Sequence, residues 1–279
     1  MANYNHFQTE QMPWKPDPGI PGFLVKRFFT DPDTGQFTEI HYVPPGWGDE
    51  VIEGKRYRHY HRSVYERALC LFGDFPHWEF RNPADTEGEL KALRTGIFMD
   101  RPPLTIHGLF PQPKSIAGAA TLAWNTGGGT SVEDPRAKDE TIEVPFENFH
   151  GINLEFTSPR FTHLADMPWQ PHPTVTGWKQ KVLGTRNTLA PEAVMVSIPP
   201  DWTPKQAHVV SAASERRWIF LFSGDLTVTV KDGAQKTRIA LREQDYLDWL
   251  PPVEVSLEPN ASAGGAVVLC VAHNLTAGK

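Results

Sequence analysis

The feature that most constrains the fold of this chain is an internal sequence repeat. The segment Met12–Pro18, which reads MPWKPDP, recurs as Met167–Pro173, which reads MPWQPHP, at an offset of 155 residues (167 minus 12). At the same offset Pro44–Trp47 matches Pro199–Trp202 with a single difference. A repeat of this length is as long as a whole domain. The sequence therefore predicts two copies of one folding unit.

Both copies are predicted to consist of β-strands. Short apolar runs alternate with turn signals, and matching Gly-Asp pairs at 73–74 and 224–225 each lie between two strand-like runs. This pattern is typical of hairpins. One short helix is predicted over residues 87–93. We therefore expect an all-β chain with domains at 1–160 and 161–279.

The composition argues against several classes of protein. The net charge is −6 with a pI near 6.0, and no basic cluster is present, so nucleic acid is not an expected partner. The sequence contains no run of 18 apolar residues, so a membrane span is not expected. The two cysteines, Cys70 and Cys270, lie in separate strand-like runs and do not form a disulfide framework, and residues 1–6 lack the layout of a signal peptide. The cytoplasm is the simplest compartment.

One stretch of the first copy carries the residue types of a metal centre. His59 and His61 are two residues apart, so on a β-strand both imidazoles leave the same face. Glu66 follows after enough chain for a turn, and His107 lies in another strand-like segment. On neighbouring antiparallel strands these four side chains can converge on Fe(II), Mn(II), Zn(II), Ni(II) or Cu(II). Any one of the histidines alone is more often a surface or core residue, so the interpretation depends on the joint pattern.

The joint pattern resembles the two sequence motifs of the cupin superfamily. It reads His-x-His-x4-Glu-x6-Gly from His59 to Gly73, then Gly-x5-Pro-x-Leu-x2-His from Gly96 to His107. The resemblance implies two tandem cupin barrels of the double-stranded β-helix, or jelly-roll, type. It also implies that the metal ligands are His59, His61, Glu66 and His107. The sequence departs from the family pattern at three positions that are not ligands, Gly54, Leu104 and Pro111.

The second copy has lost these ligands. Alignment back from Gly224 places Val210, Ala212 and Arg217 at the positions of the first two histidines and the glutamate. An arginine there would repel a cation. We expect one metal per chain, held in the first copy, and a degenerate second barrel. The sequence leaves open whether a second site is rebuilt from His208, Glu215 or His273.

Side-chain alternation gives a first prediction of the pocket around the metal. Tyr57 shares a face with His59 and His61, Phe72 with Glu66, and Thr105 and Leu109 with His107, while Phe98 is placed on the adjoining strand. After the turn at 73–74 the register is open, so either His77 or Trp78 faces inward. His77 is a candidate acid or base, and an exposed loop histidine is the simpler interpretation. The predicted pocket residues are Tyr57, Phe72, Trp78, Phe98, Thr105 and Leu109, with Glu66 and His77 as candidate catalytic groups.

Three kinds of chemistry are compatible with this site. Fe(II) could bind a small substrate with two neighbouring oxygens beside O2 and support its cleavage, as in a dioxygenase. Zn, Mn or Ni could act as a Lewis acid in an isomerase or lyase. The barrel could also bind or sense a small molecule without turnover. The leading segment, with Trp14 and Pro44–Gly46, resembles ChrR-like and dihydroxyacetophenone dioxygenase-like cupins, which favours the Fe(II) dioxygenase. The expected partners are a small-molecule substrate and O2, with a homodimer left open.

Overall fold

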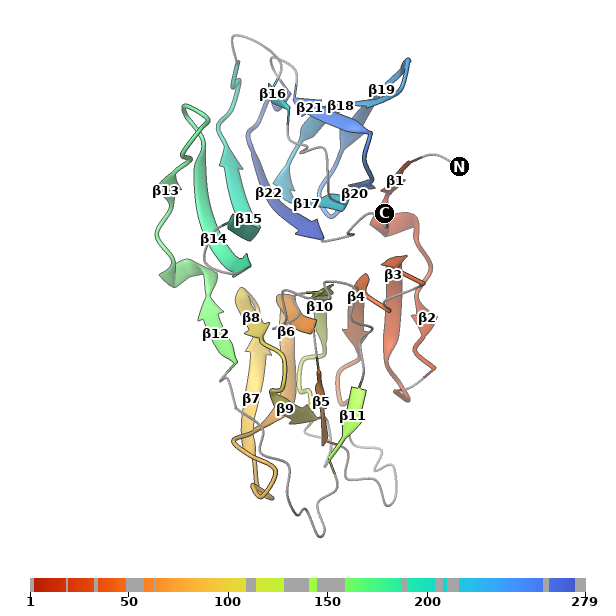
Figure 1. The fold of residues 1–279 in the computed structure, drawn as a ribbon, viewed down its shortest axis with the longest axis vertical. Helices are drawn as coiled ribbons and strands as arrows, with labels where there is room; N and C mark the ends of the chain where they lie inside the picture. The colour runs from red at the N-terminus through yellow and green to blue at the C-terminus, as the bar shows by residue number, and fades with distance from the viewer. Residues whose placement is uncertain are drawn as a thin grey trace. The chain divides into compact units, whose positions relative to one another are not determined.

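Strands account for nearly all of the regular structure in the described part of the chain. The computed structural model describes residues 3–18, 20–32, 35–48, 58–62, 64–108, 114–127, 141–144, 159–186, 190–203, 208–209, 216–257 and 261–273. These residues form strands β1 to β22 and two short 3-10 turns, without an α-helix among them (Figure 1). The all-β prediction is confirmed. No helix of the described residues is long and apolar enough to cross a membrane.

The chain divides into two compact units whose boundaries fall at equivalent points of the repeat. One unit contains Pro13–Asp166, and the other contains Met1–Met12 together with Met167–Lys279. The break after Met12 and the break after Asp166 are 154 residues apart (166 minus 12), within one residue of the repeat offset of 155. The leading segment of each repeat therefore belongs to the unit formed by the other repeat. We call the two units the first unit (13–166) and the second unit (1–12 with 167–279).

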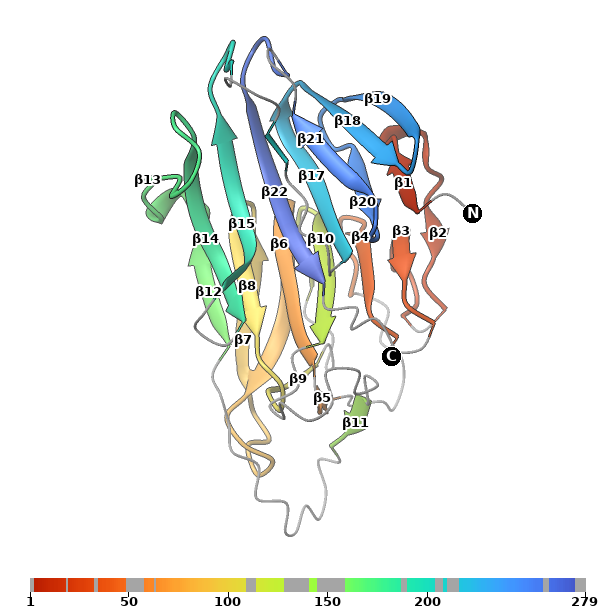
Figure 2. The same cartoon turned by 45° about the horizontal axis from the view of Figure 1, so that its top comes forward.

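Strand pairing explains this exchange. β1 (Tyr4–Phe7) pairs antiparallel with β20 (Tyr246–Trp249) in the second unit (Figure 1). Asn5 Nδ2 also donates to Asp248 Oδ1 at 2.9 Å. The corresponding strand of the second repeat, β12 (Arg160–His163), pairs with β8 (Ile97–Arg101) in the first unit (Figure 2). Each unit therefore completes a sheet with a strand from the other half of the sequence.

The first unit is organised around one long strand, β6 (Val64–Phe80). Its first half pairs with β10 and β8, and its second half pairs with β7 and β9. On one side of β6 the sheet continues from β9 to β5 and β11, and on the other side it continues from β10 to β4, β3 and β2. The strands are β2 (Lys15–Pro16), β3 (Leu24–Thr30), β4 (Phe37–Val43), β5 (Arg58–His61), β7 (Glu89–Arg94), β8 (Ile97–Arg101), β9 (Ile106–Gly108), β10 (Ala119–Gly127), β11 (Thr141–Glu143) and β12 (Arg160–His163).

The Gly-Asp pair inside β6 has a specific structural role. Gly73 has φ +81°, and a Cβ there would lie 1.9 Å from the carbonyl oxygen of Gly118, so no side chain fits. The Asp74 carboxylate accepts a hydrogen bond from the Ala117 N–H at 3.0 Å. The equivalent Gly224 has the same conflict with Gly265 at 1.9 Å. The repeated dipeptide thus builds the same close backbone contact in both units.

The predicted helix over residues 87–93 is wrong. Glu89–Arg94 forms strand β7, which pairs with the second half of β6 from Asp74 to Glu79. Pairing with an existing strand edge stabilises the extended form, which overrides the weak local helix propensity.

The second unit has a seven-stranded sheet, in the order β1-β20-β17-β22-β15-β14-β13, and a four-stranded sheet, β16-β21-β18-β19. Both sheets contribute to a continuous apolar core that includes Val196, Ile219, Val228, Val255 and Val268. The strands are β13 (Gln170–Pro171), β14 (Lys179–Arg186), β15 (Ala190–Ile198), β16 (His208–Val209), β17 (Arg216–Gly224), β18 (Leu226–Asp232), β19 (Gln235–Leu241), β21 (Glu254–Leu257) and β22 (Ala266–His273). Beside this apolar core, the described part of the second unit also holds a buried ion pair between Arg216 and Asp248.

Candidate metal centre

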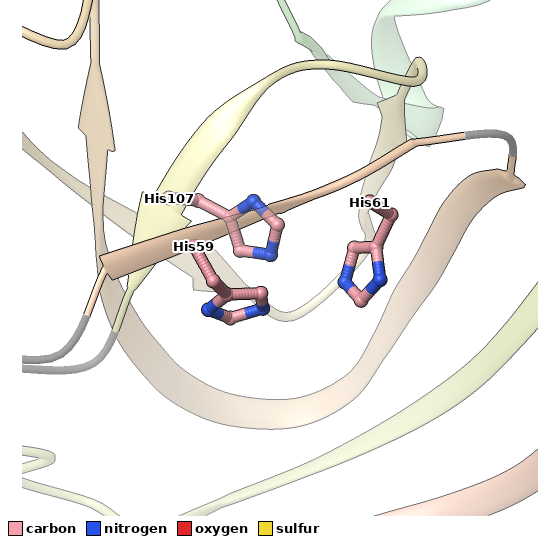
Figure 3. Close-up of side chains that lie close together, drawn as sticks. All are labelled: His59, His61 and His107. Carbon is pink, nitrogen blue, oxygen red and sulfur yellow. The ribbon is translucent and has the colours of Figure 1, made fainter. Parts of the chain in front are cut away.

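Three histidines from two adjacent strands of the first unit form a close cluster. β5 carries His59 and His61 on one face, and His59 lies opposite His107 of β9 in the antiparallel register. The ring centroids of His59 and His107 are 4.2 Å apart, and those of His61 and His107 are 5.4 Å apart. One ring nitrogen from each imidazole lies within 4.8 Å of the others. Figure 3 shows the three rings side by side. This spacing is suited to a single shared cation.

Glu66 of β6 lies beside this cluster. Its Oε2 is 3.2 Å from Nε2 of His107 and 4.0 Å from Nε2 of His61. The Glu66 side chain is 25% exposed, whereas that of His107 is 6% exposed, so the carboxylate borders the more open side of the cluster. The structure therefore brings the carboxylate oxygen close to two of the three imidazoles, those of His107 and His61. The same Oε2 atom also accepts a hydrogen bond from the guanidinium of Arg101.

Each ring nitrogen of His107 has an acceptor oxygen beside it. Nδ1 lies 2.9 Å from the carbonyl oxygen of Thr105, and Nε2 lies 3.2 Å from Glu66 Oε2. A neutral imidazole has one proton and cannot donate to both, and the tautomer that binds metal through Nε2 donates from Nδ1 to Thr105. In this tautomer Nε2 has a lone pair, and this lone pair lies next to the Glu66 carboxylate. Two acceptors at this distance repel each other unless a cation lies between or beside them. A divalent metal would satisfy both atoms together.

The electrostatic surroundings favour ligands that are free of protons. Burial, followed by the neighbouring rings of His107 and His61, holds the pKa of His59 well below its usual value. Burial and the positive charge of Arg101 also lower the pKa of His107. Burial alone would raise the pKa of Glu66, but Arg101 and His107 hold it well below the usual value. At neutral pH His59 and His107 are thus neutral imidazoles and Glu66 is an ionised carboxylate, the states that bind metal.

A buried network of charged side chains extends from Glu66 into the unit. Arg101 donates through Nη1 to Glu66, and through Nε at 3.2 Å and through Nη2 to Oε1 of Glu79. Nε2 of His77 lies 3.1 Å from the same oxygen of Glu79. The predicted register was open at this point, and the structure places His77 and Glu79 in the network. Sequence reasoning missed Arg101, although it precedes His107 by six residues and shares a face of β8 with the apolar Met99, two residues before it.

The predicted pocket residues occupy different environments. Thr105 is buried, and its carbonyl orients His107. Trp78 packs against a separate apolar cluster with Phe80 and Ile106, and so does not share the face of His77. Phe98 stacks on Trp124 with ring centroids 5.9 Å apart. It is three residues from Arg101 on β8 and therefore lies on the opposite face of that strand. Tyr57 and Leu109 lie outside the described residues.

Phe72 illustrates how a local irregularity changes the face of a side chain. Its alternation with Glu66 and Ala68 predicts a pocket position. In the structure the pairing of β6 with β10 shifts between Ala120 and Thr121, so Leu71 has no partner in the register. Such a β-bulge reverses the alternation beyond it. Phe72 is 47% exposed, and its ring lies 6.2 Å from that of Tyr42.

In the second unit, among the described residues, no second group of three ligand-type side chains lies close enough to share a metal. Arg217, the counterpart of Glu66, lies on β17 opposite Trp249. Val210, Ala212 and Glu215 fall outside the described residues, and the side chains of His208 and His273 are not described. The rebuilt second site therefore remains an untested alternative.

Comparisons with known proteins identify the fold. No protein-family model matches this sequence, and no curated protein matches it. Solved structures do match along nearly the whole chain. HEPD from Streptomyces albus, with 2-hydroxyethylphosphonate and Fe(II) bound, has a TM-score of 0.61 at 10% identity over 98% of this chain and 76% of its own. A Nostoc punctiforme protein provisionally named a dioxygenase has a TM-score of 0.61 at 11% identity, over 99% of this chain and 85% of its own.

A third similar structure has a different activity in its name. It is oxalate decarboxylase from Lactobacillus farciminis in a formate complex, with a TM-score of 0.57 at 12% identity over 98% of this chain and 87% of its own. Together these similarities show a fold of the cupin type, as the sequence motifs predicted. At such low identity they define the architecture and leave the chemistry to the residues of the site.

Proposed function

We propose that this protein is a metal-dependent enzyme that holds one divalent transition metal, Fe(II), on His59, His61, His107 and Glu66. The observation that carries the proposal is the close approach of His107 Nε2 and Glu66 Oε2, 3.2 Å apart beside two more imidazoles. Three nitrogens and one oxygen suit Fe(II) and leave positions open for other ligands. The Fe(II) bound to HEPD is consistent with this choice.

We further propose that the two units are tandem cupin barrels and that only the first unit holds metal. The contrast between the interiors supports this division. In the first unit, imidazole, carboxylate and guanidinium groups lie buried close together, with Glu79, Arg101 and His107 each at most 6% exposed. In the described part of the second unit, an apolar core is accompanied by the buried Arg216–Asp248 ion pair, and no three ligand-type side chains lie close together. Buried charged groups are costly unless they bind a partner, so the cluster of three imidazoles with the Glu66 carboxylate beside it supports a function in the first unit.

The protein's own residues prepare the site in defined ways. The Thr105 carbonyl accepts from Nδ1 of His107 in the tautomer that presents Nε2. Burial keeps His59 and His107 neutral, so both remain ligands at neutral pH. Glu66 supplies the negative charge, with Arg101 fixing its Oε2. A metal bound there would supply a Lewis acid that lowers the pKa of a chelating substrate hydroxyl and, as Fe(II), a reductant for O2.

The proposed reaction is the O2-dependent cleavage of a small substrate with two neighbouring oxygens, such as a hydroxyketone, a diketone or a catechol-like ring. The similarity to a protein named as a dioxygenase supports this reaction class. A Lewis-acid lyase is the second candidate, because oxalate decarboxylase shares the fold. Such a lyase would use the same four ligands and would not consume O2.

Metal analysis tests the site before any substrate is known. Protein purified without metal supplementation should contain about one transition metal per chain by elemental analysis. The double variant His59→Ala with His61→Ala should lose it. His163→Ala, an exposed histidine of the same unit, should keep it as the matched control. Two metals per chain, or metal retained by the double variant, would contradict the proposal.

The reaction class requires a second experiment. Protein reconstituted anaerobically with Fe(II) is mixed with hydroxyketones, diketones and catechols, and O2 uptake is followed with an oxygen electrode. Uptake that disappears in the double histidine variant supports the dioxygenase. Turnover without O2 by Zn- or Mn-loaded protein, together with no uptake by the Fe(II) form, would establish the lyase instead.

A further inference from the structure

Arg101 connects the candidate metal ligand Glu66 to a second buried carboxylate. In the antiparallel register of β6 and β8, Arg101 lies directly opposite Glu66. Its side chain is only 4% exposed. Nη1 donates to Glu66 Oε2, while Nε, at 3.2 Å, and Nη2 donate to Glu79 Oε1. One guanidinium therefore uses all three of its nitrogens on two carboxylates.

Glu79, the second carboxylate that Arg101 contacts, is itself held in place by its surroundings. Glu79 lies on the second half of β6, opposite His107 of β9, and its side chain is 7% exposed. Nε2 of His77 lies 3.1 Å from Glu79 Oε1. The His77 ring is stacked on Phe161 with centroids 5.6 Å apart. The two N–H groups on one oxygen of Glu79 fix the plane of the guanidinium, so Nη1 has one position from which to reach Glu66.

Resting on the proposed function, we propose that Arg101 is the positioning residue that sets how Glu66 binds the metal. A glutamate has several rotatable bonds, and the Glu66 side chain is partly exposed, so it needs an external restraint to occupy one position. Arg101 supplies that restraint on Oε2, the oxygen next to His107 and His61. It also offsets part of the carboxylate charge, because two carboxylates share a single guanidinium with a net charge of −1.

Arg101 has this role because of the planar arrangement of its three guanidinium nitrogens, and not because of its charge alone. A lysine at position 101 would keep the positive charge but would present one ammonium nitrogen instead of three nitrogens in a plane. It could contact Glu66 or Glu79, but it could not hold both at once as the guanidinium does. Arg101→Lys therefore separates positioning from electrostatics. If charge alone mattered, lysine would replace arginine without a change at the metal.

The strand pair also offers a matched control. Next to Arg101 on β8, Asp100 accepts from Arg67 Nε at 2.9 Å and from Arg160. Asp100 alternates with Arg101, so this second ion cluster lies on the opposite face of the strand. The Arg160 side chain is 63% exposed. Arg160→Met therefore removes an arginine that contacts β8 without touching the metal ligands.

The test uses Co(II) as the metal and the full-length protein. Co(II) affinity is measured by competition with a chelating dye, and the visible absorption of bound Co(II) reports its coordination. Arg101→Lys should weaken Co(II) binding about 10- to 100-fold, the usual effect of removing a partner of a metal ligand, and change the absorption spectrum. Arg160→Met should leave both unchanged. If circular dichroism shows that Arg101→Lys does not fold, Glu79→Gln replaces it in the test. This variant weakens the hydrogen bonds that hold the Arg101 guanidinium, so it should show the same spectral change.

The outcomes separate this inference from the function on which it rests. If wild-type protein binds Co(II), the double histidine variant does not, and Arg101→Lys has wild-type affinity and spectrum, then only the positioning role is overturned. If wild-type protein binds no Co(II), the proposed metal site itself fails. A loss of affinity without a spectral change would also overturn the inference, because it would indicate a general electrostatic or structural effect.

Discussion

Replacing Glu79 with glutamine should destabilise the first unit by an amount that depends on pH. Burial alone would raise the pKa of Glu79, but the charge of Arg101 and the neighbouring His77, 3.1 Å away, lower it from 4.5 to about 2. The difference of 2.5 units (4.5 minus 2) corresponds to about 3 kcal/mol of folding free energy at neutral pH, at roughly 1.4 kcal/mol per unit. Removing one member of a buried ion pair typically costs a similar amount.

The sign of the pH dependence follows from the direction of this shift. A carboxylate with a lowered pKa in the folded state stabilises the protein above its unfolded pKa. That stabilisation is lost progressively as the pH falls from the unfolded pKa of 4.5 through the folded pKa of about 2. At about pH 3 only about 1 kcal/mol should remain of the contribution of Glu79. The difference in unfolding free energy between wild type and Glu79→Gln should therefore shrink from about 3 to about 1 kcal/mol between pH 7 and pH 3.

Urea unfolding of metal-free protein at both pH values measures this difference. The control is Glu89→Gln on the neighbouring strand β7, where the Glu89 side chain is 55% exposed and pairs with Lys91. A surface pair of this kind contributes less than about 1 kcal/mol. The reasoning is refuted if Glu79→Gln costs no more than Glu89→Gln at pH 7, or if its cost does not fall with pH.

Three further perturbations test the site and its framework. Glu66→Ala should weaken metal binding at least about tenfold while circular dichroism shows an intact fold, because the fold depends mainly on apolar burial. Since burial lowers the pKa of His59 and His107, metal-free protein should lose stability as the pH falls below 6.5, and urea unfolding of His59→Asn should show a weaker dependence. Gly73→Ala should cost more than about 3 kcal/mol in unfolding free energy, because the new Cβ would lie 1.9 Å from a carbonyl oxygen. Gly35→Ala is the control: at φ +76° with open space around its Cβ, it should cost only about 1–2 kcal/mol.

The sequence alone was informative wherever the signal was local. The two-residue spacing of His59 and His61 places both rings on one face of any strand, whatever that strand pairs with. The repeated Gly-Asp pairs mark the close backbone contacts of both units, because only glycine fits there. The motif around His107 predicted a cupin-type fold, and the solved structures with that architecture agree.

Features that depend on strand pairing could not be read in this way. Arg101 faces Glu66 only because β8 lies beside β6 in one register, and nothing in the local sequence specifies that register. Phe72 leaves the predicted pocket face because a bulge at Leu71 reverses the alternation. The predicted helix becomes β7 because an unpaired edge of β6 is available to it.

The sequence by itself determined the repeat, the β-rich character and the residue types of the metal centre, since each follows from spacing and composition along the chain. Only the tertiary structure decided that β1 completes the sheet of the second unit and β12 that of the first. Only the tertiary structure placed Arg101 between Glu66 and Glu79. The physical reason is the same in each case. Backbone hydrogen bonds between strands are nearly independent of sequence, so their partners are selected by the packing of the whole unit and not by local residues.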